Sequence, residues 1–381
     1  MDKIFTALGL MSGTSMDGVD ASIIKSDGHS KFDNVLDKYW EFDATLHKKL
    51  IELRDEIVTK DKLIKFSNEL KILERELTIF HSKIVNEIIS NYTENIDLIG
   101  FHGQTIFHDP INRISKQLGD GELLSQLTKK KVVYNFRKND LQNGGQGAPL
   151  TPIFHNLLAN NIFNEFKDIF PNIINIGGIS NITKTVMNKD ELKNNIEAFD
   201  IGPGNCLIDE WMRKNSNKKF DKNGLTGESG INNQLLFNQA IENFNFNSYK
   251  NSLDIKDFDI SFARGLSLED GCATITNFTA YLIAEGIKFL HKKQNYFSNK
   301  YLICGGGRKN NFLIKTIKEY LNNFESISIE NIDNFNQNGD FIESQAFGYL
   351  AIRSYLGLPI TFPDTTRCNK PLTGGIIIKN F

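Results

Sequence analysis

The sequence is poor in cysteine. Its four cysteines, Cys206, Cys272, Cys304 and Cys368, lie far apart in a chain of 381 residues. Closely spaced pairs are typical of zinc sites, and a high cysteine density is typical of small secreted scaffolds. We therefore expect reduced thiols, no disulfide framework and a cytoplasmic protein.

The chain also lacks an excess of charge and any long apolar run. Its formal net charge is −2, so no basic field points to nucleic acid or to an anionic membrane surface. No apolar run approaches the about 20 residues of a membrane span. The short apolar run near the start ends in a glycine-rich stretch, which argues against a signal peptide. We expect neither a nucleic-acid partner nor a membrane partner.

Three common catalytic motifs are missing from the sequence. There is no Gly-x-x-x-x-Gly-Lys-[Ser/Thr], no Gly-x-Gly-x-x-Gly opening a βα unit and no Gly-x-Ser-x-Gly. These absences argue against a P-loop enzyme, a dinucleotide-binding fold and a nucleophile elbow. The spacing of His102, His108 and His155 fits no helical pair of metal ligands. Structural histidines are the better interpretation, with His102 a possible exception.

The most informative stretch is Gly9–Asp20, with the sequence GLMSGTSMDGVD. Apolar runs on both sides predict a strand, a polar loop and a second strand. Gly13 and Gly18 permit positive φ and the close approach of another group to the backbone. The hydroxyls of the loop, beside backbone N–H groups, favour an anion site. Asp17 is a candidate to hold a metal-bound water there. The alternative is an ordinary hairpin turn.

Strand, helix and loop alternate through the rest of the first half, which indicates an α/β fold. Residues 45–58 and 62–92 are expected to be helices. In the second helix, apolar residues recur every three or four positions, which predicts a packed face. A buried strand at 95–100 should present the sequence FHGQT at its end. A glycine-rich loop at 143–150 follows.

The second half repeats the scheme of the first. An apolar strand at 173–176 meets Gly177 and Gly178, and a second strand leaves at 182–186. Two such hairpins, one opening each half, suggest a duplicated fold with a cleft between the halves.

Two further strand ends carry candidate functional groups. A strand at 196–200 ends in Asp200, before a Gly-Pro-Gly turn. Ligands of open α/β sheets bind beyond the carboxyl ends of strands. The alternative role of Asp200 is to cap the following turn. A strand at 301–304 runs into three consecutive glycines, which allow a flat ligand to lie against backbone. A last helix, 340–355, carries Glu343 near its start.

Taken in order, six motifs resemble the anhydro-N-acetylmuramic acid kinases of bacterial cell-wall recycling. They cover nearly the whole chain and are GLMSGTSMDGVD at 9–20, GQT at 103–105, GGQGAPL at 144–150, NIGGISN at 175–181, FDIGPGN at 199–205 and CGGG at 304–307. Each motif alone is weak, but six in register are specific.

The resemblance implies the fold of the acetate kinase, sugar kinase, Hsp70 and actin superfamily. Two ribonuclease H-like domains in that superfamily bind ATP and Mg²⁺ in the cleft between them. We expect the first domain at 1–150 and the second at 151–381, with the last helix free to pack back on the first. The resemblance also implies a cytoplasmic homodimer. The implied reaction opens the 1,6-anhydro bridge of anhydro-N-acetylmuramic acid with water and phosphorylates O6 from ATP.

The resemblance also implies roles for residues at matching positions. Asp200 matches the catalytic base, and Glu343 matches a glutamate that helps to hold the attacking water. The expected ATP-binding residues are Ser12, Gly13, Thr14, Ser15, Met16, Asp17, Gly18, Val19, Gly177, Gly178, Gly305, Gly306 and Gly307, with Asp17 contacting the metal through water. The expected sugar-binding residues are His102, Gln104, Thr105, Arg137 and Asn181.

The chain departs from the family pattern at two places. Asn135 stands where the family usually has an aspartate, which leaves a pairing role of that position open. The segment 250–254, KNSLD, replaces the usual Lys-Ser-Thr-Gly-[Arg/Lys]-[Glu/Asp]. Two other functions stay open at this stage: an ATP-driven binding protein of the same fold, and a kinase for another sugar.

Overall fold

The computed structural model describes residues 3–167, 170–187, 196–244, 249, 252–293, 298–324 and 326–381. The chain forms two compact units. The first comprises Met1–Leu157 and Phe341–Phe381, and the second comprises Leu158–Asp340. The C-terminal segment therefore groups with the first unit, an arrangement that the sequence left open. Whether the units match the domains expected at 1–150 and 151–381 stays a prediction.

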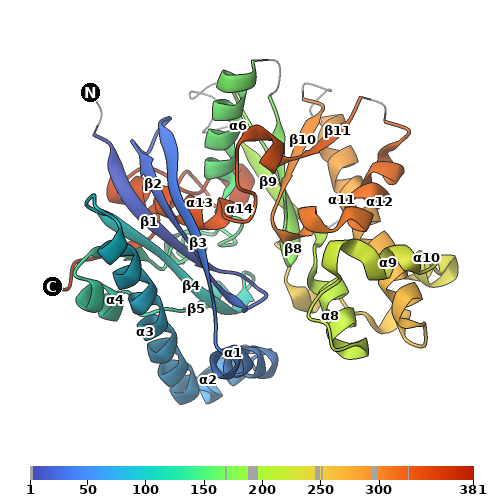
Figure 1. The fold of residues 1–381 in the computed structure, drawn as a ribbon, viewed down its shortest axis with the longest axis horizontal. Helices are drawn as coiled ribbons and strands as arrows, with labels where there is room; N and C mark the ends of the chain where they lie inside the picture. Colours follow the sequence, from blue (N-terminus) through green and yellow to red (C-terminus); the bar gives the residue numbers. More distant parts are fainter. Residues whose placement is uncertain are drawn as a thin grey trace. The chain divides into compact units, whose positions relative to one another are not determined.

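The sheet of the first unit is mixed (Figure 1). Its central strand β1 pairs antiparallel with β2, which pairs antiparallel with β3. On its other side β1 pairs parallel with β4, and β4 pairs parallel with β6. The order is β12-β6-β4-β1-β2-β3, with β5 also on β4. The strands are β1 (Phe5–Ser12), β2 (Gly18–Ser26), β3 (Phe32–Glu41), β4 (Leu98–Asp109), β5 (Ile114–Leu118), β6 (Lys131–Tyr134) and β12 (Ile376–Ile378).

The sheet of the second unit repeats this order. Its central strand β7 pairs antiparallel with β8, which pairs antiparallel with β9. On the other side β7 pairs parallel with β10, and β10 with β11. Its strands are β7 (Asn172–Ile176), β8 (Ile179–Lys184), β9 (Glu197–Pro203), β10 (Lys300–Cys304) and β11 (Ser328–Asn331). The α/β fold with two ribonuclease H-like domains is thus confirmed, and both predicted hairpins are present.

The helices of the first unit follow the predicted pattern. The expected helix 45–58 is α1, and the expected helix 62–92 is divided into α2 and α3. Asp43 caps α1 by accepting from two backbone N–H groups, as capping residues do. The apolar face of α3 is buried at Leu70, Leu73, Leu77, Ile84 and Ile88. The helices are α1 (Ala44–Glu56), α2 (Lys60–Lys65), α3 (Ser67–Asn91), α4 (Gly121–Thr128), α5 (Lys138–Gln142), α13 (Ile342–Tyr355) and α14 (Pro363–Thr366).

Helix α13 packs against the first sheet because glycines let the backbones approach closely. A Cβ atom on Gly9 would lie 1.9 Å from the carbonyl oxygen of Ser344. A Cβ atom on Gly100 would lie 2.1 Å from that of Phe347. Any side chain at either glycine would therefore push the helix off β1 and β4. This contact explains why the C-terminal segment belongs to the first unit.

The second unit places its helices around a long central one. Gly286 of α11 sits against Ile201 of β9, where a Cβ atom would lie 2.5 Å from the isoleucine side chain. Leu313 and Ile317 of α12 join the same apolar core. The helices are α8 (Cys206–Asn215), α9 (Leu225–Ser229), α10 (Gln234–Asn243), α11 (Leu268–Lys293) and α12 (Asn311–Leu321), while α6 (Pro152–Phe166) spans the boundary between the units. Within the ranges described, no helix is long and apolar enough to cross a membrane.

Two predicted strands end later than expected, and the strand expected at 182–186 is β8, which runs from Ile179 to Lys184. The strand expected at 95–100 is β4, which continues to Asp109 because β5 folds back and pairs with it. The strand expected at 196–200 is β9, which continues to Pro203 because β8 pairs with it as far as Ile179. Asp200 therefore lies within a strand and not at its end.

Candidate functional site

The loop of the first hairpin is tied at its base by two buried side chains. The Ser12 hydroxyl lies 2.8 Å from the Gly18 carbonyl oxygen and 2.6 Å from Oε1 of Gln104. The amide Nε2 of Gln104 donates to the Gly13 carbonyl oxygen at 3.0 Å. Gln104 thus uses both ends of its amide to hold the loop. Its predicted contact with a sugar stays a prediction.

The tip of this loop is polar and open. Thr14, Ser15 and Asp17 are exposed, and the Ser15 hydroxyl donates to Oδ1 of Asp17 at 2.6 Å. Among the described residues, chain neighbours aside, the nearest atom to a Cβ built on Gly13 is the Ser15 hydroxyl oxygen, at 4.0 Å. The loop therefore leaves space beside its backbone for another molecule.

Positive φ occurs at a different residue from those the sequence suggested. Met16 adopts φ 56°, and neither Gly13 nor Gly18 lies in that region. Gly18 is required for another reason, since a Cβ there would lie 2.3 Å from the carbonyl oxygen of Trp40. Neither glycine uses the positive φ that its lack of a side chain permits, but the close approach of another group is present at Gly18. The predicted ATP contact of the adjacent Val19, which is buried, stays a prediction.

Sequence reasoning missed a cation beside this loop. Nη1 of Arg54, on α1, donates to the Thr14 carbonyl oxygen at 3.3 Å. The same guanidinium pairs with its neighbour Asp55. No motif marks Arg54, because its helix is recognisable only by amphipathic spacing.

The structure brings His102 and Arg137 together. Nδ1 of His102 donates to the Gly103 carbonyl oxygen at 2.8 Å, and Nη2 of Arg137 lies 2.9 Å from Nε2. Nη1 of Arg137 donates to the Gly147 carbonyl oxygen at 2.6 Å. Burial, helped by the charge of Arg137, lowers the pKa of His102 to about 3. The ring is therefore neutral at physiological pH, with Nε2 as the acceptor.

The predicted sugar-binding residue Thr105 and the departure from the family pattern at Asn135 lie near this pair in the sequence. Thr105 lies in β4, where its hydroxyl accepts from Gln117 at 3.3 Å. Asn135 adopts φ 58°, a conformation that asparagine tolerates better than most residues. The Arg137 guanidinium binds His102 and the Gly147 carbonyl, so it does not depend on a carboxylate at position 135.

In the second unit, Asp200 is held in β9 with 6% of its surface exposed. The backbone N–H of Leu253 donates to Oδ2 of Asp200 at 2.8 Å. Asn181 of β8 is its register partner, beside an irregularity between Ser180 and Asn181. Within the described residues, Oδ1 of Asn181 is buried without a hydrogen-bond partner. Such an atom points to a bound water or ligand.

The departure at 250–254 proves compatible with the Asp200 contact. Residues 250 and 251 lie outside the described residues. Leu253 contacts Asp200 through its backbone N–H, which does not depend on the side chain. The altered sequence therefore provides a backbone donor to the candidate base.

The turn of the second hairpin is closed by its own chain. The carbonyl oxygen of Gly178 accepts from the N–H of Gly204 at 2.8 Å, and that of Gly177 accepts from Asn205 at 2.7 Å. A Cβ on Gly204 would lie 2.1 Å from the Gly177 oxygen. The turn thus fixes the start of α8 just after the strand that carries Asp200.

The three glycines at 305–307 differ in what surrounds them. Gly305 has φ 81°, and a Cβ there would lie 2.4 Å from Oδ1 of Asn175. A Cβ on Gly307 would lie 2.2 Å from the side chain of Ile176. Gly306 faces open space in the part of the chain that the structure describes, where the nearest atom to a Cβ beyond its chain neighbours is Nδ2 of Asn205, at 3.4 Å. Two of the glycines are therefore needed for packing, and the middle one leaves room for a ligand.

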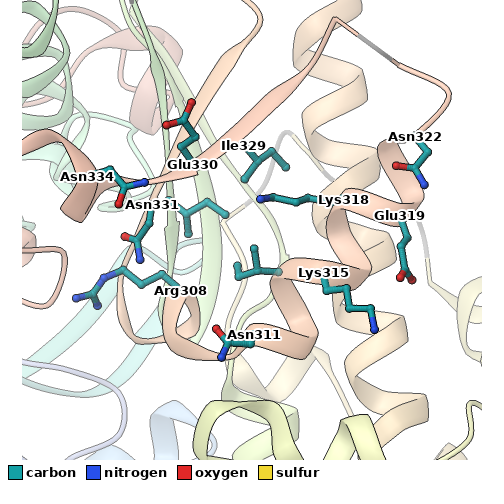
Figure 2. Close-up of a pocket in the computed structure, with 12 residues that line it drawn as sticks. Arg308, Asn311, Lys315, Lys318, Glu319, Asn322, Ile329, Glu330, Asn331 and Asn334 are labelled. Carbon is teal, nitrogen blue, oxygen red and sulfur yellow. The ribbon is translucent and has the colours of Figure 1, made fainter. Parts of the chain in front are cut away.

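A pocket of about 540 Å³ lies between α12 and β11 (Figure 2). Its wall combines isoleucines with charged residues and asparagines. No sequence motif indicates this pocket, because its residues come from several helices and strands that meet only in the fold. The lining residues are Ile303, Arg308, Asn311, Ile314, Lys315, Lys318, Glu319, Asn322, Ile329, Glu330, Asn331 and Asn334.

Glu343 lies in the first turn of α13, as predicted, and is half-buried. It belongs to the first unit, whereas Asp200 belongs to the second. Its role beside Asp200 stays a prediction. In the part of the chain that the structure describes, no three His, Cys, Asp or Glu side chains form a metal-binding group.

The comparisons with known proteins agree with the motifs. The family model for anhydro-N-acetylmuramic acid kinase matches residues 5–380. Two relatives carry the same name: one from Pelagibacter ubique, 50% identical, and one from Brucella canis, 36% identical, each covering 100% of both chains. A solved activator of the 2-hydroxyisocaproyl-CoA dehydratase from Clostridium difficile, with bound ADPNP, covers 91% of this chain and 94% of its own at 12% identity. Its TM-score of 0.40 is too low to carry an argument.

Together these findings define a kinase with two ribonuclease H-like domains. More particularly, the chain belongs to the anhydro-N-acetylmuramic acid kinase family. It is therefore an enzyme, and an ATP-driven binding protein without catalysis is no longer a competing interpretation.

Proposed function

We propose that this kinase opens the 1,6-anhydro ring of 1,6-anhydro-N-acetylmuramic acid with water and phosphorylates O6. The products are N-acetylmuramic acid 6-phosphate and ADP. The observation that carries the proposal is the full-length match to relatives with this name, joined to a buried carboxylate, Asp200, at the matching motif. We place the enzyme in the cytoplasm as a homodimer that recycles peptidoglycan fragments or catabolises amino sugars.

Asp200 acts as the general base in this proposal. Acetal hydrolysis needs a carboxylate to take a proton from the water that attacks the anomeric carbon. The N–H of Leu253 orients the Asp200 carboxylate from one side. Asn181, with its unpartnered amide oxygen, contributes a sugar or water contact next to it. Glu343 helps to hold the attacking water.

The leaving oxygen needs no separate acid in this scheme. As water adds to the anomeric carbon, the bond from that carbon to O6 breaks and its electron pair stays on O6. O6 then attacks the γ-phosphorus of ATP, and the bond to ADP breaks. Phosphoryl transfer depends mainly on positioning and charge neutralisation, so the base is the main proton acceptor that the protein must supply.

The polar hairpin loop and the glycine turn are the proposed contacts for ATP. The open space at Gly13 and the exposed hydroxyls around it suit the phosphates. Gly306, with room beside its backbone, suits the adenosine side. Gly177 and Gly178, in the turn of the second hairpin, are further proposed ATP-binding residues.

Mg²⁺ fits the donors that the loop offers. This ion keeps several waters and binds nucleotide phosphates with only one or two protein carboxylates. Asp17 is an exposed carboxylate at the loop tip, whereas a site built from many protein ligands is not found among the described residues. Bound Mg²⁺ would neutralise phosphate charge, with Asp17 holding one of its waters.

The sugar contacts are proposed from the first unit. His102 contributes to the sugar site chiefly by orienting Arg137, because both nitrogens of its neutral ring are already hydrogen-bonded. Arg137 suits the lactyl carboxylate that distinguishes muramic from glucosamine sugars, because guanidinium groups bind carboxylates in a fixed geometry. Thr105 and Gln104 complete the wall, with Gln104 acting chiefly through the loop.

A panel of anhydro and open amino sugars tests the proposal. ADP release should require an anhydro muramic sugar, and product mass should increase by one water and one phosphoryl group. Release of ADP with an open hexosamine alone would indicate a kinase for another sugar. Release of phosphate without a sugar product would contradict the proposal.

A further inference from the structure

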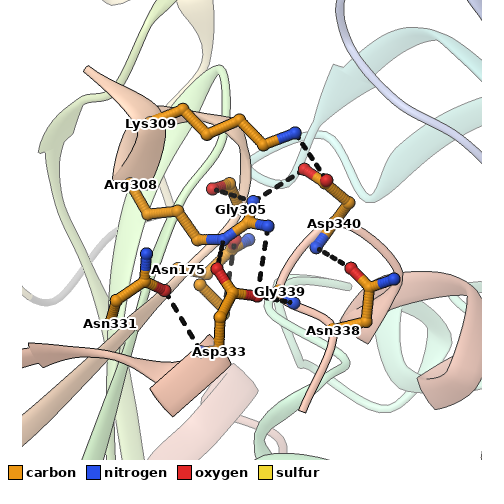
Figure 3. A network of polar contacts seen from close by, with 10 residues as sticks. Asn175, Gly305, Arg308, Lys309, Asn331, Asp333, Asn338, Gly339 and Asp340 are labelled. Atoms are coloured by element: carbon orange, nitrogen blue, oxygen red, sulfur yellow. Dashed lines mark hydrogen bonds and ion pairs between the residues drawn. The ribbon is translucent and has the colours of Figure 1, made fainter. Parts of the chain in front are cut away.

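Arg308 follows the three glycines and is buried in a network of polar contacts (Figure 3). Only 4% of its side chain is exposed. Nε and Nη2 donate to the two carboxylate oxygens of Asp333, at 2.7 and 3.2 Å. Nη1 donates to Oδ1 of Asp340 at 2.6 Å and to the carbonyl oxygen of Gly305 at 3.1 Å. One guanidinium thus joins the glycine turn to two carboxylates.

The glycine turn and the segment from Asp333 to Asp340 are also joined through backbone groups. The N–H of Gly305 donates to the Gly339 carbonyl oxygen at 3.0 Å. The N–H of Gly339 donates to Oδ1 of Asp333 at 2.8 Å. A Cβ on Gly339 would lie 2.4 Å from Nε of Arg308, so glycine is needed there for the arginine to fit. We call Arg308, Asp333, Asp340, Gly305 and Gly339 the arginine clamp.

Lys309 also pairs with Asp340, so two cations face the two carboxylates of the clamp. Burial raises the pKa of Asp333 and of Asp340, but the hydrogen bonds and the charge of Arg308 outweigh it, so that both pKa values are lowered. A buried ion pair adds little stability over apolar packing, yet removing one partner leaves a costly unpaired charge. The clamp is therefore better explained by the geometry it imposes than by the stability it adds.

The turn has its own backbone hydrogen bond, from the Arg308 N–H to the Gly305 carbonyl oxygen at 3.2 Å, and the Arg308 side chain adds a second donor to the same oxygen. Gly305 and Gly307 have no side chains to restrict the backbone, and glycine loses the most conformational freedom on ordering. A ligand that binds backbone atoms gains affinity when they are ordered beforehand. Arg308 supplies this order from behind, through the Gly305 carbonyl oxygen.

We propose that Arg308 is a positioning residue for nucleotide binding: the arginine clamp holds the turn at Gly305–Gly307 in the shape that receives ATP and ADP. The inference rests on the proposed function only in that the turn faces nucleotide. It assigns no contact between Arg308 and the ligand. It adds that the affinity for nucleotide depends on Asp333 and Asp340, two residues that no motif marked.

The substitution Arg308→Lys tests the clamp most directly. Lysine keeps the charge but cannot bridge two carboxylates and a carbonyl group in the same geometry. We expect the Kd for ADP, measured by calorimetry without sugar, to rise about tenfold. Turnover at saturating ATP and the KM for sugar should stay within about twofold, because the clamp acts on nucleotide binding alone. Asp340→Asn, a milder change, carries the test if the lysine variant does not fold.

Lys300→Gln is the matched control. Lys300 forms a half-buried ion pair with Glu330 between β10 and β11, so its loss should lower thermal stability without moving the turn. Its ADP Kd should equal that of the wild type. A purely structural clamp would instead reduce the active fraction and leave the KM for ATP and the Kd for ADP unchanged.

The outcomes separate the clamp from the proposed function. If the wild-type protein binds ADP tightly but does not turn over the anhydro sugar, the proposed function is contradicted. The effect of the clamp on the Kd for ADP can still be measured in that case. An unchanged ADP Kd in folded Arg308→Lys or Asp340→Asn protein would overturn the clamp. The clamp would also be overturned if Lys300→Gln lost as much affinity for ADP as Arg308→Lys, or if the wild-type protein bound no ADP.

Discussion

The two hairpins have the same place in their sheets but opposite surroundings. In the first, the loop between β1 and β2 leaves Thr14, Ser15 and Asp17 exposed. In the second, the turn between β7 and β8 is closed by backbone hydrogen bonds from Gly204 and Asn205. One hairpin presents a polar loop to solvent, and the other anchors the start of α8.

The difference shows how one repeated frame supports two tasks. Strand order is fixed by apolar packing within each sheet, and loops are free to vary on it. The open loop suits an anionic ligand, whereas the closed turn supports the neighbouring strand that carries Asp200. If this interpretation is correct, substitutions at equivalent places in the two units should have different effects.

Asp200→Asn should have the largest effect on activity. Asparagine preserves size and the acceptor for the Leu253 N–H, but it removes the basicity. We expect turnover to fall by on the order of 10² to 10⁴, while the binding of ATP and sugar changes little. Steady-state kinetics with calorimetry of both substrates would measure this. Wild-type turnover in the variant would mean that another group is the base.

Acid should destabilise the first unit more than the second. Burial lowers the pKa of His81 to about 4 and of His102, His108 and His155 to about 3. Since the unfolded values are near 6.5, the unfolded chain binds protons that the folded unit cannot. Stability should therefore be fully present above pH 6.5 and fall as pH drops toward 3, by about 1.4 kcal/mol per pH unit for each histidine.

Urea unfolding from pH 7.5 to pH 5, followed by hydrogen exchange in each unit, measures this loss. His81→Gln should reduce the pH slope, whereas His29→Gln, at an exposed position, should leave it unchanged. His291 in the second unit also has a pKa lowered by burial, so the second unit should lose some stability in acid as well. Equal acid sensitivity of the two units would contradict the explanation.

Two glycine substitutions compare the hairpins directly. Gly204→Ala should destabilise the protein by about 1–3 kcal/mol, because the new Cβ collides with the Gly177 oxygen. Gly13→Ala should leave the melting temperature unchanged, because its Cβ enters open space. We expect the KM for ATP to rise severalfold in Gly13→Ala, as the methyl group occupies the space proposed for phosphate. Thermal unfolding and ATP saturation curves of both variants measure this difference. A loss of stability in Gly13→Ala as large as that in Gly204→Ala would contradict an open loop at Gly13.

Arg54→Ala should have the smallest effect. Arg54 contacts the open loop through one long hydrogen bond to Thr14, so its loss should raise the KM for ATP by about two- to fivefold. Lys48→Ala on the same helix, whose ion pair is exposed, is the control and should have no effect. A KM for ATP that Arg54→Ala leaves unchanged would limit Arg54 to packing.

The sequence predicted the fold class and both hairpins because their signals are local. Apolar runs broken by glycine identify strands and turns, and the spacing of Leu70, Leu73 and Leu77 identifies a packed helix face. It failed where pairing with another strand decides the outcome. The extensions of β4 past Gly100 and of β9 past Asp200 depend on pairing with β5 and β8, which the pattern of β4 or β9 alone does not reveal.

The candidate site was predictable only in part for the same reason. Motifs marked Asp200 and the glycine turns, but not the surroundings that distinguish Gly306 from Gly305 and Gly307. Arg54, Asp333 and Asp340 lie outside every motif, and their contacts with the loop and the turn arise only in three dimensions. Gln104 was expected to bind sugar, and the structure shows its amide holding the loop.

Hydrolysis in ¹⁸O-labelled water tests the central claim, that Asp200 directs water to the anomeric carbon while O6 takes the phosphoryl group. The account predicts label at the anomeric hydroxyl, read promptly by mass spectrometry before exchange, and no label in the phosphate of the product. Asp200→Asn should lose both the labelled sugar and ADP together. Label in phosphate would show that water attacks ATP, and would contradict the account.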